Sequence, residues 1–207
     1  MFWHGSDVGR LTHMKELWPY LSRIRTDITH ICHSDLLQEE LARIGVYALV
    51  RPTFWGDVTK YKPCYKYSDK PQVYISSHIG REIEYGEGYM FALATVFPDL
   101  KFHVYGSYNA EMDAEESASL IETPKNLVYH GQIPEEVMDK ETAKMQICLR
   151  PNVRDGFSQT VIKAILREQY LITMVEYDGI PYAKDFNSLC DIIEGYICSG
   201  TVQMLAA

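Results

Sequence analysis

The sequence of 207 residues lacks several patterns that would assign it to a common class of protein. It contains no run of 18 apolar residues, so we expect no membrane-spanning helix. Its first residues lack the basic segment and the apolar block of a secretory signal peptide. No internal repeat or low-complexity segment is evident. The length suits one good-sized globular domain and part of another.

Cysteine is present, but its arrangement argues against a structural metal site. The five cysteines are widely separated, and no CxxC pair occurs. Three of them lie inside apolar runs, where cysteine behaves as a small hydrophobic residue. An odd number of such residues favours free thiols in a reducing compartment. We therefore expect a cytoplasmic protein that binds no metal.

Charge and glycine spacing argue against two further classes. The chain has 20 Lys and Arg against 28 Asp and Glu, a net charge of −8. A general nucleic-acid binder normally has a basic surface, so we expect no nucleic-acid partner, although a local basic pocket stays possible. No GxGxxG follows an expected strand, so another Rossmann-like dinucleotide site is a weaker alternative.

From residue 72 onward, short apolar runs alternate with segments of helical periodicity. This alternation predicts an α/β fold, with a mainly parallel sheet and helices on both of its faces. The expected strands are residues 73–76, 101–105, 126–130, 145–149 and 171–175. The expected helices are residues 86–97, 135–143, 157–166 and 185–198.

The first 62 residues have a weaker pattern. We expect a strand end that leads into a loop at residues 4–7, a helix over 11–24, strands at 28–32 and 46–50, and a helix over 35–44. Ser34 is the expected N-cap of that last helix, which should stop at Gly45. Residues 51–71 read as a linker or crossover. A chain that opens on a strand end suggests that an N-terminal half is absent.

The stretch from Leu149 to Ala164 is the candidate ligand-binding segment. It predicts a strand, a polar turn with Pro151, and a helix that Asp155 or Ser158 caps. Open α/β sheets bind ligands at the carboxyl ends of their strands. The unpaired N–H groups and the dipole of a helix N-terminus favour an anion there. The alternative is an ordinary connecting loop with no ligand.

Several segments, taken in order, resemble one family. They are Pro98–Gly106 (PDLKFHVYG), Asn126–Gly131 (NLVYHG) with Pro134-Glu135-Glu136 behind it, Arg150–Ser158, and Tyr177–Ile180. This set resembles the C-terminal, donor-binding domain of GT-B glycosyltransferases, close to glycosyltransferase family 4. The resemblance implies a Rossmann-like three-layer domain over residues 63–207. Residues 1–62 resemble the tail of the first domain plus the crossover, because His4-Gly5-Ser6-Asp7 is similar to a late loop of that domain.

The resemblance implies transfer of a sugar, with retention, from a nucleotide-diphosphate donor to an unknown acceptor, without metal or cofactor. Asp155 and His4 are then the implied catalytic residues, near the transferring sugar. A companion chain or a homo-oligomer would have to supply the missing acceptor domain. The residues implied to hold the donor are Gly80, Arg81, Arg150, Gly156, Phe157, Ser158 and Lys163.

Two positions depart from the family pattern. Glu87 stands where the family has a phosphate-binding Lys, and Lys163 stands where it has a Glu that holds the ribose. A carboxylate repels a diphosphate, whereas Lys163 suits a phosphate better than a ribose hydroxyl. These departures leave a second hypothesis open, a non-catalytic, degenerate binding module. Two of the implied site residues have an alternative role. Arg150 could instead form a structural salt bridge, and His4 could be an ordinary loop residue.

Overall fold

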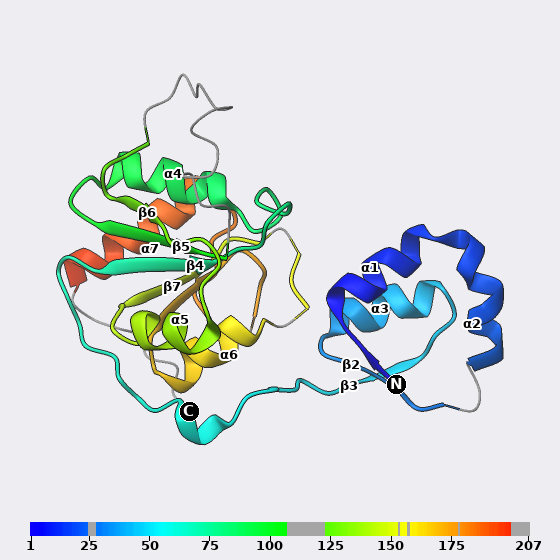
Figure 1. Cartoon of the computed structure of the whole chain (residues 1–207). Coiled ribbons are helices and arrows are strands. Elements are labelled where there is room, and N and C mark those ends of the chain that lie inside the picture. Colours follow the sequence, from blue (N-terminus) through cyan, green and yellow to red (C-terminus); the bar gives the residue numbers. More distant parts are fainter. Residues whose placement is uncertain (25–27, 107–122, 153, 157, 178, 200–207) are drawn as a thin grey trace. The chain divides into compact units, whose positions relative to one another are not determined.

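The computed structural model describes all residues except 25–27, 107–122, 153, 157, 178 and 200–207. The chain forms two compact units (Figure 1). The smaller unit comprises Met1–Asp57 with Asp155–Gln159, and the larger comprises Val58–Arg154 with Thr160–Ala207.

The larger unit is built on a five-stranded sheet in which every pair of neighbours is parallel. The strand order is β6-β5-β4-β7-β8, so the chain runs outward from β4 in one direction and from β7 in the other. The position between β4 and β7 is therefore the topological switch point of the sheet. The strands are β4 (Gln72–Ser76), β5 (Lys101–Tyr105), β6 (Leu127–Tyr129), β7 (Ile147–Arg150) and β8 (Tyr170–Thr173).

Helices cover both faces of this sheet (Figure 1). Helices α4 (Glu87–Val96) and α7 (Phe186–Ser199) pack on one face, and α5 (Glu135–Thr142) and α6 (Gln159–Leu166) on the other. Period-two alternation in β5 sends Phe102 and Val104 into the α4 and α7 core, and Tyr105 into the other core. A three-layer α/β unit with a parallel sheet results, and it confirms the predicted fold class.

The smaller unit is a three-stranded parallel sheet of order β1-β2-β3. Leu37 and Leu41 of α3 and Val8 of α1 pack as fully buried side chains in its core. The Ser34 Oγ accepts a hydrogen bond from the Leu37 N–H at 3.4 Å, which confirms the expected N-cap. The elements are β1 (Phe2–Trp3), α1 (Gly5–His13), η1 (Lys15–Leu17), α2 (Trp18–Ile24), β2 (His30–Cys32), α3 (Asp35–Arg43) and β3 (Ala48–Val50).

Two expectations about this unit were wrong. The loop predicted at residues 4–7 is the start of α1, because His4 serves as an extended N-cap directly after β1. The single helix predicted over 11–24 is interrupted at Met14, whose φ of −93° and ψ of 72° are not helical. Pro19 lies in the first turn of α2, where its missing N–H would have had no helical partner. Proline therefore fits the restart of a helix rather than its middle.

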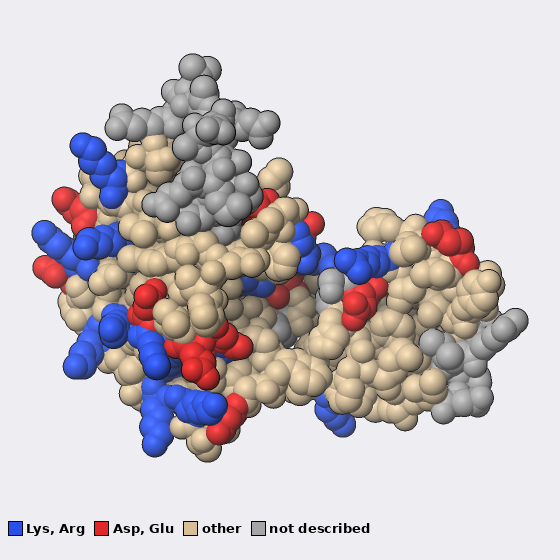
Figure 2. Space-filling view, in the orientation of Figure 1, with Lys and Arg blue, Asp and Glu red and all other residues tan. Residues whose placement is uncertain are grey.

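Within the described ranges, no helix is long and apolar enough to cross a membrane. All five cysteines are free thiols. Figure 2 shows Lys and Arg side chains interspersed with Asp and Glu side chains on one face of the larger unit.

Candidate functional site

The carboxyl ends of β4 and β7 meet at the switch point, and Arg150 ties them together. Its Nη1 donates to the Ser76 carbonyl oxygen at 3.3 Å, which joins the last residue of β7 to the last residue of β4. Arg150 is buried, and its Cζ lies over the ring of Tyr85, 4.9 Å from the centroid. The guanidinium is thus fixed at the edge of the sheet where ligands of such folds bind.

The loop after β4 brings a second guanidinium to the same ring. Arg81 lies 5.4 Å from the Tyr85 centroid, and its Nε donates to Glu84 Oε2 at 2.8 Å. Gly80 has φ of +74°, a conformation that side chains disfavour, and its N–H donates to Glu82 Oε1 at 2.7 Å. The structure therefore brings together two residues that the sequence singled out, Arg81 and Arg150.

Glu87, the departure from the family pattern, opens α4. It accepts a short hydrogen bond from the buried hydroxyl of Ser77. The preceding Gly86 has φ of +70°, and a Cβ there would lie 2.6 Å from the Pro151 carbonyl oxygen. Only glycine lets the start of α4 lie so close to the turn after β7. The helix N-terminus stabilises the Glu87 carboxylate, so a negative charge stands where the family pattern has a cation.

The polar turn after β7 is largely buried. Asn152 is 3% exposed and Asp155 is 7% exposed. The Asn152 Oδ1 has no hydrogen-bond partner within the described ranges. Gly156 and Ser158 are half-buried, and Phe157 lies outside the described residues. Asp155, Gly156 and Ser158 belong to the smaller unit, whereas Gly80, Arg81 and Arg150 belong to the larger one.

Lys163 has partners that the sequence did not reveal. Its Nζ donates to Glu135 Oε1 at 2.5 Å and to both Asp139 oxygens at 3.1 Å. Burial lowers the pKa of Lys163, but its hydrogen bonds to these two carboxylates outweigh that effect and raise the pKa. Arg167 Nη2 also donates to Asp139 Oδ1, at 3.1 Å. Lys163 and Glu87 thus take different partners, and the carboxylates of α5 balance the charge of Lys163.

His4 lies in the smaller unit among aromatic rings. Its centroid is 5.1 Å from that of His33 and 5.4 Å from that of Trp55. Both histidines directly follow parallel strands, β1 and β2, in which Trp3 is the register partner of Cys32. Sequence reasoning selected His4, and not His33, as a site residue. The two histidines share a position directly after a strand, and that position is the signal that could have identified His33.

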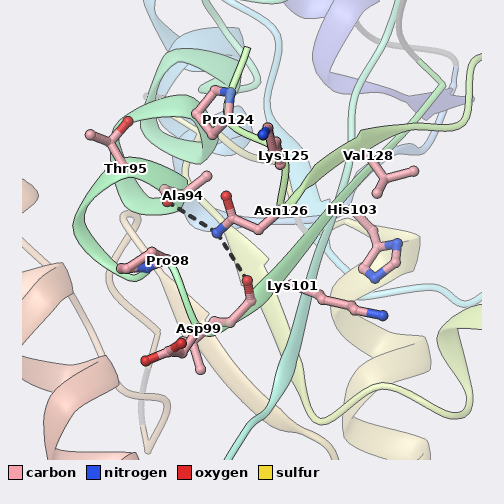
Figure 3. Close-up of a pocket in the computed structure, with 11 residues that line it drawn as sticks. Ala94, Thr95, Pro98, Asp99, Lys101, His103, Pro124, Lys125, Asn126 and Val128 are labelled. Atoms are coloured by element: carbon pink, nitrogen blue, oxygen red, sulfur yellow. Dashed lines mark hydrogen bonds between the residues drawn. The ribbon is translucent and has the colours of Figure 1, made fainter. Parts of the chain in front are cut away.

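A separate hollow of about 770 Å³ lies at the opposite, amino ends of β5 and β6 (Figure 3). Asn126 is one of its lining residues, and Asn126 Nδ2 donates to the carbonyl oxygens of Ala94, Phe97 and Leu100 at 2.9–3.0 Å. His103 also lines it, and its Nδ1 lies 2.9 Å from His130 Nε2. None of the residues predicted from the sequence to bind or react lines this hollow.

Comparison with known proteins gives fold matches alone. The sequence matches no protein-family model and no curated protein. Among solved structures, it is similar to HepE of Anabaena, solved with UDP-glucose, with a TM-score of 0.68 at 13% identity over 90% of this chain and 59% of that one. TarM of S. aureus, in a complex that contains UDP, has a TM-score of 0.62 at 13% identity, over 86% of this chain and 39% of that one. Sucrose-phosphate synthase of Thermosynechococcus elongatus has a TM-score of 0.63 at 12% identity, over 88% of this chain and 52% of that one.

These matches define the fold of the chain. They are glycosyltransferases, and the fold they share with this chain is the Rossmann-like fold of the GT-B architecture. The chain spans between 39% and 59% of the length of these three structures. At 12–13% identity the likeness shows the fold and does not transfer the activity.

Proposed function

We propose that this chain binds a nucleotide-diphosphate sugar and takes part in transferring the sugar, with retention, to an acceptor. The observation that carries the proposal is the placement of Arg81 and Arg150 on the Tyr85 ring, at the switch point of the sheet. As the sugar leaves, the diphosphate gains negative charge, and fixed cations stabilise that charge. The fold matches include structures solved with UDP and with UDP-glucose, which supports this donor class.

In the proposed reaction, the bond between the anomeric carbon and a diphosphate oxygen breaks. The acceptor hydroxyl oxygen forms the new bond, and its proton leaves with the diphosphate. Arg81 and Arg150 hold the diphosphate, with the backbone around Gly80 beside it. Asp155 and His4 are assigned to the transferring sugar by the family resemblance alone. Gly156, Phe157 and Ser158 complete the donor loop, and no metal is required.

Arg81 is available for this role because its present partner holds it weakly. The side chains of Arg81 and Glu84 are 39% and 61% exposed, and an ion pair at that exposure contributes little stability. A diphosphate with two negative charges competes well for the same guanidinium. Lys163 is the least supported member of the proposed site, since Glu135 and Asp139 already balance its charge.

We propose that a companion chain or a second copy supplies the acceptor-binding surface. The smaller unit supports this, because Phe2, Ile31 and Leu49 are register partners across its three strands. Phe2 and Leu49 remain 48% and 53% exposed on that face. Parallel sheets are usually covered on both faces, so this apolar row is suited to burial by a further segment.

The test is isothermal titration of the protein with UDP, GDP and ADP and with their glucose conjugates. We expect one nucleotide to bind selectively, and its affinity to fall roughly tenfold in Arg81→Ala and in Arg150→Lys, the latter chosen to keep the buried charge. Lys101→Ala, at the opposite end of the sheet, is the matched control and should bind normally. If no nucleotide binds, or if Arg81→Ala binds as the wild type does, the proposed function is wrong.

A further inference from the structure

A buried histidine lines the hollow at the amino ends of β5 and β6. The hollow has a volume of about 770 Å³, and the side chain of its lining residue His103 is only 9% exposed. The Nε2 atom of His103 has no hydrogen-bond partner among the residues that the structure describes. Buried polar atoms normally have partners, and a hollow of this size has room for a small ligand. A ligand in the hollow would supply a partner to Nε2.

A row of side chains decides which nitrogen of His103 carries the proton. The Glu141 carboxylate accepts a hydrogen bond from the Tyr105 hydroxyl at 2.9 Å, and its Oε2 lies 3.7 Å from His130 Nδ1. That negative charge favours the proton on His130 Nδ1, which leaves His130 Nε2 as an acceptor. His103 Nδ1, 2.9 Å from His130 Nε2, is then the donor of this pair. His103 Nε2 is consequently an acceptor, and a ligand must bring a donor to it.

The protonation state of His103 restricts the ligand further. Burial lowers the pKa of His103 to about 4, and the nearby His130 and Lys101 add to that effect, while Glu141 opposes it. The ring is therefore neutral at pH 7 and attracts no anion by a charge of its own. A bare anion has no hydrogen to donate, so it gives Nε2 nothing to accept. A hydroxyl group has the required hydrogen.

The charges around the hollow call for an acidic group beside that hydroxyl. Lys101 and His103 are two residues apart on β5 and therefore point to the same face, where Figure 3 shows them side by side. Nε2 itself is covered, and the long, exposed Lys101 side chain can turn to admit a ligand. Lys125 also lines the hollow, as does Asp99, whose carboxylate lies on the side away from His103 in Figure 3. Two ammonium groups and one carboxylate disfavour a cation and suit a singly charged carboxylate better than a doubly charged phosphate.

We propose that this hollow binds a small hydroxycarboxylate. The ligand hydroxyl donates to His103 Nε2, and the neighbouring carboxylate pairs with the Lys101 ammonium. Pro98 and Val128, which also line the hollow, provide apolar surface for the carbon atoms of the ligand. The site lies at the opposite end of the sheet from the proposed donor site, so it goes beyond the proposed function and does not depend on it.

Isothermal titration of the full chain with glycolate, lactate and glycerate tests the site. We expect at least one of them to bind, and propionate, which lacks the hydroxyl, and glycerol, which lacks the charge, to bind roughly tenfold more weakly or not at all. His103→Phe, which keeps a ring but removes both nitrogens, and Lys101→Ala should each lower the affinity for the hydroxycarboxylate roughly tenfold. Lys140→Ala is the matched control, because Lys140 is exposed in the same unit and does not line the hollow.

The outcomes separate this site from the donor site. Thermal melts show whether His103→Phe is folded, and Lys101→Ala tests the site at an exposed position if it is not. Failure of all three hydroxycarboxylates to bind would overturn the site, and nucleotide binding in the same protein would leave the proposed function standing. Equal binding of propionate would overturn the role of His103 Nε2. Tighter binding of glycerol phosphate than of glycerate would overturn the assignment to a carboxylate.

Discussion

Arg81 and Arg150 share one aromatic ring, that of Tyr85, with their Cζ atoms 5.4 Å and 4.9 Å from its centroid. One guanidinium comes from the exposed loop after β4, and the other from the buried end of β7. Like charges repel, so the contact of both groups with the same electron-rich ring, together with the ion pair of Arg81 with Glu84, stabilises an arrangement that is otherwise unfavourable. An anion bound by both arginines would remove the remaining repulsion.

Tyr85 should therefore act as a positioning residue for the diphosphate. Tyr85→Ala is expected to weaken nucleotide binding about fivefold, because the loss of two cation–π contacts lets both arginines move. Tyr85→Phe keeps the ring and should bind within about twofold of the wild type. Titration calorimetry checks both variants, with Tyr47→Ala as the control for loss of an exposed tyrosine. Equal affinity in the alanine and phenylalanine variants would show that the ring has no such role.

The fold was largely predictable from the sequence, because apolar runs such as 101–105 alternate with helical segments at regular spacing. The pairing of Arg81 with Tyr85 also had a local signal, their separation by four residues. The partners of Lys163 had none, since Glu135 is 28 positions away and only the packing of α5 against α6 brings it close. The start of α1 was missed because His4 is not a typical N-cap residue.

Stability should fall between neutral and mildly acidic pH because of His103. Burial lowers the pKa of His103 to about 4, and its neighbours His130 and Lys101 add to that effect, while Glu141 opposes it. The unfolded chain binds a proton near pH 6.5, but the folded chain does so only near pH 4. Stability is therefore full above pH 6.5 and is lost as the pH falls through this window, by an amount on the order of 3 kcal/mol.

Urea unfolding of the wild type and of His103→Phe at pH 7.5 and at pH 5 measures this loss. The difference between the two pH values should shrink in the variant, because the group that titrates is gone. Burial also lowers the pKa of His130, so part of the dependence should survive in the single variant. An unchanged pH dependence in His103→Phe would place the titrating group elsewhere.

Lys163→Glu restores the carboxylate of the family pattern, yet it should destabilise the larger unit. The new side chain would face Glu135 and Asp139, which now lie 2.5 Å and 3.1 Å from the Lys163 Nζ. Reversal of a half-buried ion pair of this kind is expected to lower the free energy of unfolding by roughly 3 kcal/mol. Urea unfolding checks this, with the exposed Lys140→Glu as the control. Equal losses in both variants would mean that the network around Asp139 contributes little.

Glu87→Lys should strengthen donor binding, because it replaces the negative charge at the start of α4 with the cation of the family pattern. The substitution removes a carboxylate from the start of α4 and adds a phosphate ligand there, although it breaks the hydrogen bond to Ser77. We expect the affinity for the selected nucleotide diphosphate to rise about tenfold at low salt, and the gain to shrink as salt screens the charges. Glu87→Gln keeps the shape, can still accept from Ser77, and should give only part of the gain. If Glu87→Lys binds the nucleotide no better than the wild type, the diphosphate does not lie beside α4, and the donor must be sought elsewhere along the carboxyl edge of the sheet.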